Sequence, residues 1–237
     1  FKVVENLLIK VFQKFSNKKF LNEKFPRIPF KEAMLKYATD KPDLRNPLQI
    51  NDLTKIFERE DVKFDIFKKL VKSGSVVRSI VTKNTKDKPR SFFDNLDKWA
   101  KTEGASGMAY FTFEKDKNLT AKGPVGKFFS SEALREIREI TGAQIGDSIF
   151  FSCDKEINVL QLMSLARDKI AEELNLIDSN TFAFCWIVDY PMYEIDKISG
   201  KIKFSHNPFS MPQGEEKEID FENPLNIKAY QYDIVCN

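Results

Sequence analysis

A nearly uninterrupted apolar run, FAFCWIVDY at residues 182–190, limits the possible folds of this chain more than any other feature. A strand with one wet face alternates apolar and polar residues, so an unbroken run is typical of a strand that is buried on both faces. No run in the sequence approaches the length of about 20 apolar residues that a membrane helix needs. We therefore expect a soluble protein in which this strand lies near the centre of a sheet.

The charge balance and the cysteines argue against several classes of protein. With 38 basic and 35 acidic residues the formal net charge is only +3, whereas a dedicated nucleic-acid-binding domain usually has a more one-sided basic surface. The three cysteines, Cys153, Cys185 and Cys236, form no CxxC or Cys/His spacing, which argues against a disulfide framework and a zinc site. No charged-then-apolar leader opens the sequence, so we expect a cytoplasmic protein.

Both ends of the sequence lie inside periodic patterns. Apolar residues recur at helical spacing from residue 3 to residue 15, directly after Phe1. Residues 232–237 (YDIVCN) have the composition of a strand, and no turn residue follows them. We expect this sequence to be an internal piece of a longer polypeptide.

The middle of the sequence predicts a small α+β domain. β-Branched and aromatic residues favour strands, and the predicted helices between them are amphipathic. Ser130 or Ser131 is placed to cap the second of these helices, and Gly142 is placed to end it. The predicted order is strand, helix, strand, loop, helix and strand, at residues 75–82, 91–101, 108–113, 115–126, 130–142 and 149–151.

The flanking stretches predict the elements of a larger scaffold. Short helices are predicted at residues 31–37 and 53–57, a long amphipathic helix at residues 158–174 and a hairpin at residues 196–203. No GxGxxG, no glycine-rich loop ending in Lys-Ser/Thr and no GxSxG occurs. A single histidine excludes a metal site of several histidines. The residues alone therefore indicate an α+β protein and leave its function open.

Five stretches in the same order carry a resemblance to a known family. They are residues 25–34 (FPRIPFKEAM), 37–48 (YATDKPDLRNPL), 186–193 (WIVDYPMY), 205–212 (SHNPFSMP) and 232–237 (YDIVCN). Together they resemble the catalytic core of bacterial-type aspartyl-tRNA synthetases after the second signature motif. Residues 102–111 (TEGASGMAYF) resemble the GAD domain, the insertion that interrupts this core. The resemblance extends over essentially the whole sequence.

This resemblance implies a fold and a division into domains. The fold class is α+β, with part of a class II synthetase antiparallel-sheet catalytic domain interrupted by a small α+β insertion domain. Residues 1–60 would be the first part of the catalytic domain, 61–157 the GAD-like insertion and 158–237 the second part of the catalytic domain.

The resemblance also implies an activity and its partners. Aspartyl-tRNA synthetases activate L-aspartate with ATP and Mg²⁺ and transfer it to the terminal adenosine of tRNA(Asp); whether tRNA(Asn) is a second substrate stays open. The parent enzyme is expected to be a homodimer. The sequence lacks the family's signature motifs, so this piece alone is expected to be inactive. The alternative is a non-catalytic module for binding RNA or protein, built on the insertion domain.

The resemblance singles out two residues for substrate and metal. His206 matches a histidine that contacts the aspartate substrate, in keeping with the hydrogen bond that an imidazole donates to a carboxylate. The family often has a second histidine next to it, where this sequence has Asn207. Asp233 matches an acidic residue that holds Mg²⁺ against ATP, and carboxylates are the ligands this ion prefers.

The loop at residues 40–45 has two interpretations. Its similarity to the family places Asp40, Lys41, Asp43 and Arg45 beside the active site or the end of the tRNA. Alternatively it is a rigid proline loop in which Asp43 and Arg45 pair structurally. Residues 38–39 are Ala-Thr where the family commonly has Gly-Ser. Asp189, at the end of the apolar run, is expected to cap a turn and is assigned no catalytic role.

Overall fold

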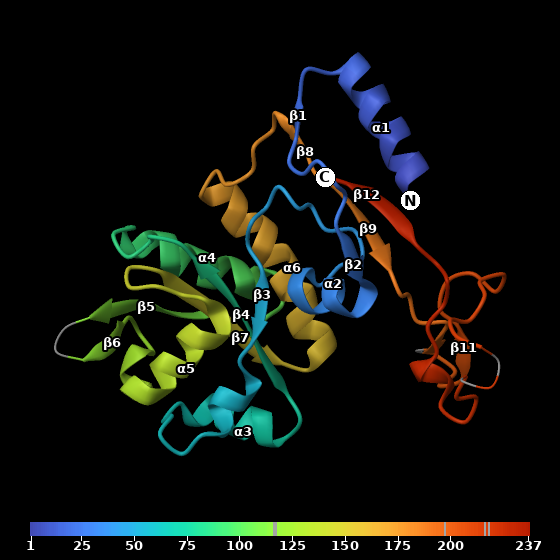
Figure 1. The fold of residues 1–237 in the computed structure, drawn as a ribbon. Coiled ribbons are helices and arrows are strands. Elements are labelled where there is room, and N and C mark those ends of the chain that lie inside the picture. The colour runs from blue at the N-terminus through green and yellow to red at the C-terminus, as the bar shows by residue number, and fades with distance from the viewer. Residues whose placement is uncertain (116–117, 197, 216, 218) are drawn as a thin grey trace. The chain divides into compact units, whose positions relative to one another are not determined.

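The computed structural model describes residues 1–115, 118–196, 198–215, 217 and 219–237. The chain forms two compact units, which are described one at a time. The first unit comprises Phe1–Met34, Thr39–Arg45 and Ile177–Asn237, and the second comprises Leu35–Ala38 and Asn46–Leu176. Figure 1 labels their elements along the chain. Among the described residues, no helix is both long enough and apolar enough to cross a membrane.

The first unit is built on a three-stranded sheet in the order β12-β9-β2, with short strand pairs β1-β8 and β10-β11 beside it. Its elements are α1 (Lys2–Phe15), β1 (Lys19–Phe20), β2 (Arg27–Pro29), the start of α2 (Phe30–Tyr37), β8 (Thr181–Phe182), β9 (Phe184–Val188), β10 (Tyr193–Ile195), β11 (Ile202–Phe204), the 3-10 turn η4 (Pro224–Asn226) and β12 (Asp233–Cys236). Strand β9 pairs antiparallel with β12 and parallel with β2.

Strand β9 confirms the interpretation of the apolar run. Cys185 and Ile187 on one face are fully buried, and Trp186 on the other face is 3% exposed. Helix α1 covers the face of Trp186, where the ring of Phe12 meets that of Phe184 edge-on at 5.0 Å. The indole Nε1 of Trp186 donates to Glu5 Oε1 of helix α1 at 2.8 Å. The buried indole N–H therefore has a hydrogen-bond acceptor.

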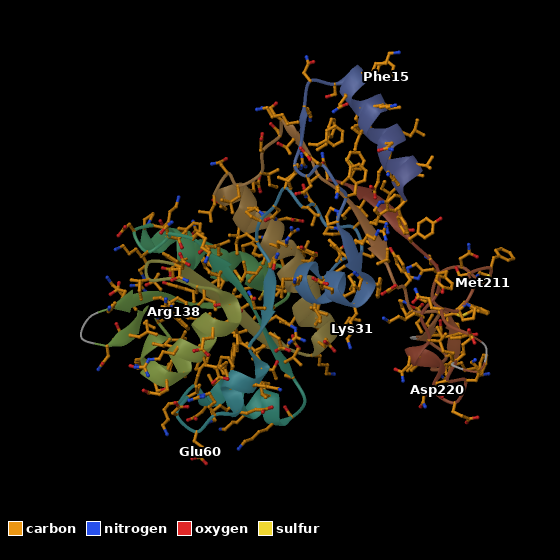
Figure 2. All side chains as sticks on the ribbon, in the orientation of Figure 1. Phe15, Lys31, Glu60, Arg138, Met211 and Asp220 are labelled. Carbon is orange, nitrogen blue, oxygen red and sulfur yellow. The ribbon has the colours of Figure 1, made fainter. Side chains whose placement is uncertain are left out.

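Helix α1 also carries apolar side chains that are largely exposed. Val3 is 82% exposed and Leu7 59%. Phe15, at the far end of the helix, is 78% exposed and is labelled in Figure 2. The helix therefore buries one apolar face against the sheet and leaves another in contact with water.

The second unit is a five-stranded antiparallel sheet in the order β3-β4-β7-β5-β6. Its elements are β3 (Ile50–Asp52), the 3-10 turn η1 (Thr54–Glu58), α3 (Asp65–Lys72), β4 (Val76–Thr82), α4 (Arg90–Thr102), β5 (Ala109–Lys115), β6 (Leu119–Lys122), the 3-10 turn η2 (Gly126–Phe128), α5 (Ser131–Thr141), β7 (Ser148–Asp154) and α6 (Glu156–Glu173). The predicted α+β class is confirmed.

Helices cover both faces of this sheet. In β7, Ile149 and Phe151 point to one face and Phe150 to the other, as the period of two in a strand requires. The first face packs against α5 through Leu134 and Ile137. The opposite face packs against helices α4 and α6. The sheet is therefore the middle of three layers (Figure 1).

Three features differ from the expected arrangement of elements. The segment 115–126, predicted to be a loop, contains β6, which pairs with β5; as an edge strand it needs no apolar face on both sides. Strand β3 pairs with β4, and α6 packs against β4 and β7. Through these contacts Asn46–Leu176 and Leu35–Ala38 form one compact unit.

Candidate active site

Tyr190 is the side chain around which the polar residues of the first unit gather. It follows β9 and is fully buried. Its hydroxyl donates to Asp233 Oδ2 at 3.0 Å, across the antiparallel pair β9-β12, in which Asp233 lies opposite Ile187. Burial, followed by the hydrogen bond and charge of Asp233 and the charge of Asp40, raises the pKa of Tyr190 far above its usual range. The phenol therefore stays protonated and acts as a donor.

The loop that follows α2 brings a cation and a second carboxylate to the same place. Lys41 Nζ donates to Asp40 Oδ2 at 2.9 Å. This hydrogen bond raises the pKa of Lys41, and the charges of Asp40 and Asp233 add to the effect. Lys41 and Asp233 also line one surface hollow, together with Trp186 and Tyr232. Two carboxylates, an ammonium group and a phenol thus form one polar cluster.

His206 approaches this cluster from the segment after β11. Its ring meets that of Tyr190 edge-on, with centroids 4.8 Å apart, and lies 6.1 Å from the ring of Phe30. Its Nδ1 is 2.8 Å from Ser205 Oγ. In the described part of the chain Nε2 has no hydrogen-bond partner, and the residue is exposed. The imidazole is therefore held by its Nδ1 side and can offer Nε2 to a ligand.

Asn207, next to His206, makes a local structural contact. Its Oδ1 accepts a hydrogen bond from the backbone N–H of Phe209 at 2.9 Å. An asparagine that bonds the backbone two residues on stabilises a turn. Asn207 therefore holds the turn that carries His206.

Asp43 and Arg45 pair with each other. Arg45 Nη2 lies 2.7 Å from Asp43 Oδ2 and Arg45 Nε lies 3.0 Å from Asp43 Oδ1, a two-pronged contact between side chains about one fifth exposed. The hydrogen bond to Asp43 raises the pKa of Arg45. Asp43 Oδ1 also accepts from the backbone N–H of Arg45 at 2.9 Å. This geometry matches the rigid-loop interpretation for Asp43 and Arg45, whereas Asp40 and Lys41 join the cluster at Tyr190.

Asp189, next to Tyr190, has a positive φ of 58°, which is uncommon for a residue other than glycine. Its carboxylate accepts from Gln213 Nε2 at 3.0 Å and lies 3.6 Å from Lys228 Nζ. Gln213 Nε2 also donates to the carbonyl of Ala229 at 3.0 Å. These contacts fix the turn that points Tyr190 inward, in keeping with the structural role expected of Asp189.

Comparison with known proteins identifies the family. The sequence model described as tRNA synthetases class II (D, K and N) matches residues 1–237. The chain belongs to this family of class II tRNA synthetases.

Several curated relatives match the whole of this synthetase chain. It is 72% identical over 237 residues to an aspartate–tRNA(Asp/Asn) ligase of Pelagibacter ubique (strain HTCC1062), covering 100% of the chain and 40% of that protein. It is 51% identical to a protein of the same name from Ehrlichia chaffeensis (strain ATCC CRL-10679 / Arkansas), of which it covers 39%. The chain thus spans about 40% of the length of these relatives.

In the synthetase chain, four of the six candidate residues lie together, and the other two pair with each other. Asp40, Lys41, His206 and Asp233 meet at Tyr190. Asp43 and Arg45 form their own pair. Tyr190 itself was not a candidate, because its place at the end of an apolar run indicated a core residue. The signal that could have identified it is a hydroxyl at the end of a strand buried on both faces, since a buried hydroxyl needs a partner.

Proposed function

We propose that this chain is part of an aspartate–tRNA ligase. The ligase would activate L-aspartate with ATP and transfer it to the 3′ end of tRNA(Asp) and, as the names of the relatives suggest, of tRNA(Asn). The observation that carries this proposal is the 72% identity to a ligase of that name along the whole chain. The alternative, a module that only binds RNA or protein, has no support among the matched relatives.

In this proposal His206 selects the amino acid. The imidazole Nε2 would donate to the side-chain carboxylate of aspartate, because Nδ1 already faces Ser205 Oγ. The aromatic rings of Tyr190 and Phe30 hold the imidazole edge-on. Because the imidazole is already oriented before the substrate binds, little conformational entropy is lost on binding. This favours both the affinity for aspartate and its orientation.

Asp233 would hold the metal that accompanies ATP. Mg²⁺ in nucleotide sites is usually bound by one or two carboxylates, with water and phosphate oxygens as the other ligands. Asp233 Oδ2 accepts from Tyr190, and Oδ1 has no hydrogen-bond partner among the described residues. Within that same part of the chain, no three His, Cys, Asp or Glu side chains gather into a metal cluster. A single carboxylate, that of Asp233, therefore fits an ion whose other ligands come from ATP and water. The ion would neutralise charge on the phosphates during attack by the aspartate carboxylate.

The other parts of the chain have proposed roles as well. Lys41, with its raised pKa, would stay charged beside the substrate phosphates or the end of the tRNA. We assign residues 1–60 and 158–237 to the catalytic domain and residues 61–157 to the GAD-like insertion. The resemblance also supports a cytoplasmic homodimer, and we propose that the isolated 237-residue chain does not charge tRNA.

A segment exchange tests the proposed function. The matching segment of the Pelagibacter ubique ligase is replaced by this chain, and charging of tRNA(Asp) and tRNA(Asn) with labelled aspartate is measured. The chimera is expected to charge tRNA at a rate of the same order as the intact ligase, because 72% identity preserves the packing against the rest of the enzyme. The isolated chain serves as the inactive control. A folded chimera that charges neither tRNA would contradict the proposal.

A further inference from the structure

A cavity in the second unit gathers positive charge on one side. It has a volume of about 420 Å³ and is lined by residues from the start of α4 and from the hairpin β5-β6. Four basic residues line it: Lys86 and Lys88 before α4, Arg90 at its first residue, and Lys122 at the end of β6. No carboxylate is among the described residues that line it. We call this feature the basic cavity.

The positive charge of the basic cavity is poorly neutralised by the protein. Arg90 lies 3.3 Å from Asp94 and Lys122 lies 3.8 Å from Glu114, and the basic side chain of each pair is about four fifths exposed. Ion pairs between exposed side chains of this kind contribute little to stability. In the described part of the chain the ammonium group of Lys86 has no hydrogen bond or ion pair. Two of the four cations therefore have only weak, exposed ion pairs, and Lys86 has none among the described residues.

The floor of the basic cavity is rigid. The ring of Tyr110 on β5 stacks on that of Phe93 on α4 with centroids 4.6 Å apart. Thr112 Oγ1 donates to the carbonyl of Lys122 at 3.1 Å, which ties the end of β6 to β5. A Cβ at Gly123 would lie 3.1 Å from the carbonyl oxygen of Tyr110, so the backbone passes close to β5 there. Arg90 and Lys122 are thus carried by α4 and β6, whereas Lys86 and Lys88 lie in the loop before α4.

We propose that the basic cavity binds a phosphate group, either in the backbone of an RNA strand or on a small phosphorylated molecule such as pyrophosphate. Lysine and arginine bind phosphate by charge and by hydrogen bonds to several oxygens. A volume of about 420 Å³ lies within the range of roughly 300–1,000 Å³ that is common for ligand sites. A phosphate group has more charge and more acceptor oxygens than a carboxylate, so it matches four cations better. The proposed site shares no residue with the cluster at Tyr190 and does not depend on the role proposed for that cluster.

A charge-neutralising variant of the 237-residue chain tests this site. Lys86→Gln, Lys88→Gln and Arg90→Gln are combined, and Lys63→Gln, Lys69→Gln and Lys72→Gln form the matched control. The control removes the same net charge from exposed lysines on and before α3, outside the cavity. Binding of a labelled RNA hairpin is followed by anisotropy at several salt concentrations, and binding of inorganic pyrophosphate by calorimetry. Circular dichroism checks that each variant is folded.

The two probes separate the sources of the phosphate. If the cavity variant binds RNA at least about ten-fold more weakly, with a shallower salt dependence than the control, the ligand is an RNA backbone. If it loses pyrophosphate and keeps RNA, the ligand is a small phosphorylated molecule. Equal binding of both probes by the cavity variant and the control, or no binding of either probe by the unaltered chain, would overturn the proposal.

Discussion

Tyr190 connects the buried core of the first unit to the candidate site through its hydroxyl group. Its ring is fully buried behind β9, whereas its oxygen reaches Asp233, the first residue of β12. His206 rests against the same ring. A buried hydroxyl bonded to a carboxylate holds that carboxylate in one orientation. The position of Asp233 therefore depends on the packing of the sheet.

Replacing Tyr190 with phenylalanine tests this link at the scale of one residue. Tyr190→Phe is expected to lower the free energy of unfolding of the first unit by about 1.5 kcal/mol at neutral pH, because a hydrogen bond to a charged group is lost. The measurement is urea denaturation followed by Trp186 fluorescence in a Trp99→Phe background. Tyr230→Phe, which alters a tyrosine that is 63% exposed, is the control and should have little effect.

The loss of stability in Tyr190→Phe should also depend on pH. The folded state raises the pKa of Tyr190, whereas in the unfolded chain the phenol ionises near its ordinary pKa of about 10. The stability contributed by this tyrosine is therefore complete below pH ~10 and is lost as the pH rises above that value. The difference in free energy of unfolding between the wild-type chain and Tyr190→Phe should therefore become smaller above pH ~10. A difference that became larger there would contradict the assigned hydrogen bond.

The residues of the candidate site could be predicted only in part. His206 and Asp233 were found through resemblance to a family, since a lone histidine and a strand aspartate carry no local signal. Their meeting at Tyr190 depends on β12 pairing with β9, a contact between segments 46 residues apart that periodicity cannot reveal (Asp233 opposite Ile187). For Asp43 and Arg45 the sequence left two interpretations, and in the structure the two side chains pair with each other.

Helix α5 shows how local sequence defines an element. Ser130 is its N-cap and accepts a hydrogen bond from the backbone N–H of Ala133 at 3.0 Å. Gly142 ends it with a φ of 67°, in the left-handed region that favours glycine. Ser130 also donates to Asp61, and the hydrogen bonds from Arg59 and Ser130 lower the pKa of Asp61 to about 2. One side chain therefore joins the helix start to the segment after η1.

Ser130→Ala is expected to destabilise the second unit by about 1–2 kcal/mol, because the first turn of α5 loses its cap. Ser91→Ala, in the first turn of α4, is the matched control, since no hydrogen bond of its side chain is recorded in the described chain. Thermal or urea denaturation followed by Trp99 fluorescence, in a Trp186→Phe background, provides the comparison. Equal stability of the two variants would show that Ser130 does not cap the helix.

The elements that the sequence predicted well are those with a strong periodic pattern or a marked end, such as α5, β4 and β9. Strand β6 was missed because its four residues, LTAK, are too short a run to establish a period and form the edge of the sheet. Helix α6 was predicted at nearly its observed bounds, but its partners were not. Amphipathic spacing shows which face of a helix is buried and does not show which sheet buries it.

At the scale of the whole molecule, the chain combines two units with different proposed tasks. The first unit carries the cluster at Tyr190, for which we propose aspartate and ATP. The second carries the basic cavity, for which we propose a phosphate group. Ala38, next to the junction of these units along the chain, has a positive φ of 56°. Glycine adopts this conformation without strain, whereas alanine rarely does.

The most direct test of the site is aspartate-dependent exchange of labelled pyrophosphate into ATP by the chimera with the Pelagibacter ubique ligase. Three variants are compared: His206→Ala, Asp233→Asn, and the control Glu23→Gln, which alters an exposed carboxylate of the first unit. We expect His206→Ala to raise the KM for aspartate far more than the KM for ATP. Asp233→Asn should shift the Mg²⁺ requirement upward, and Glu23→Gln should change neither quantity. An unchanged aspartate KM in His206→Ala, together with an unchanged Mg²⁺ titration in Asp233→Asn, would contradict these expectations.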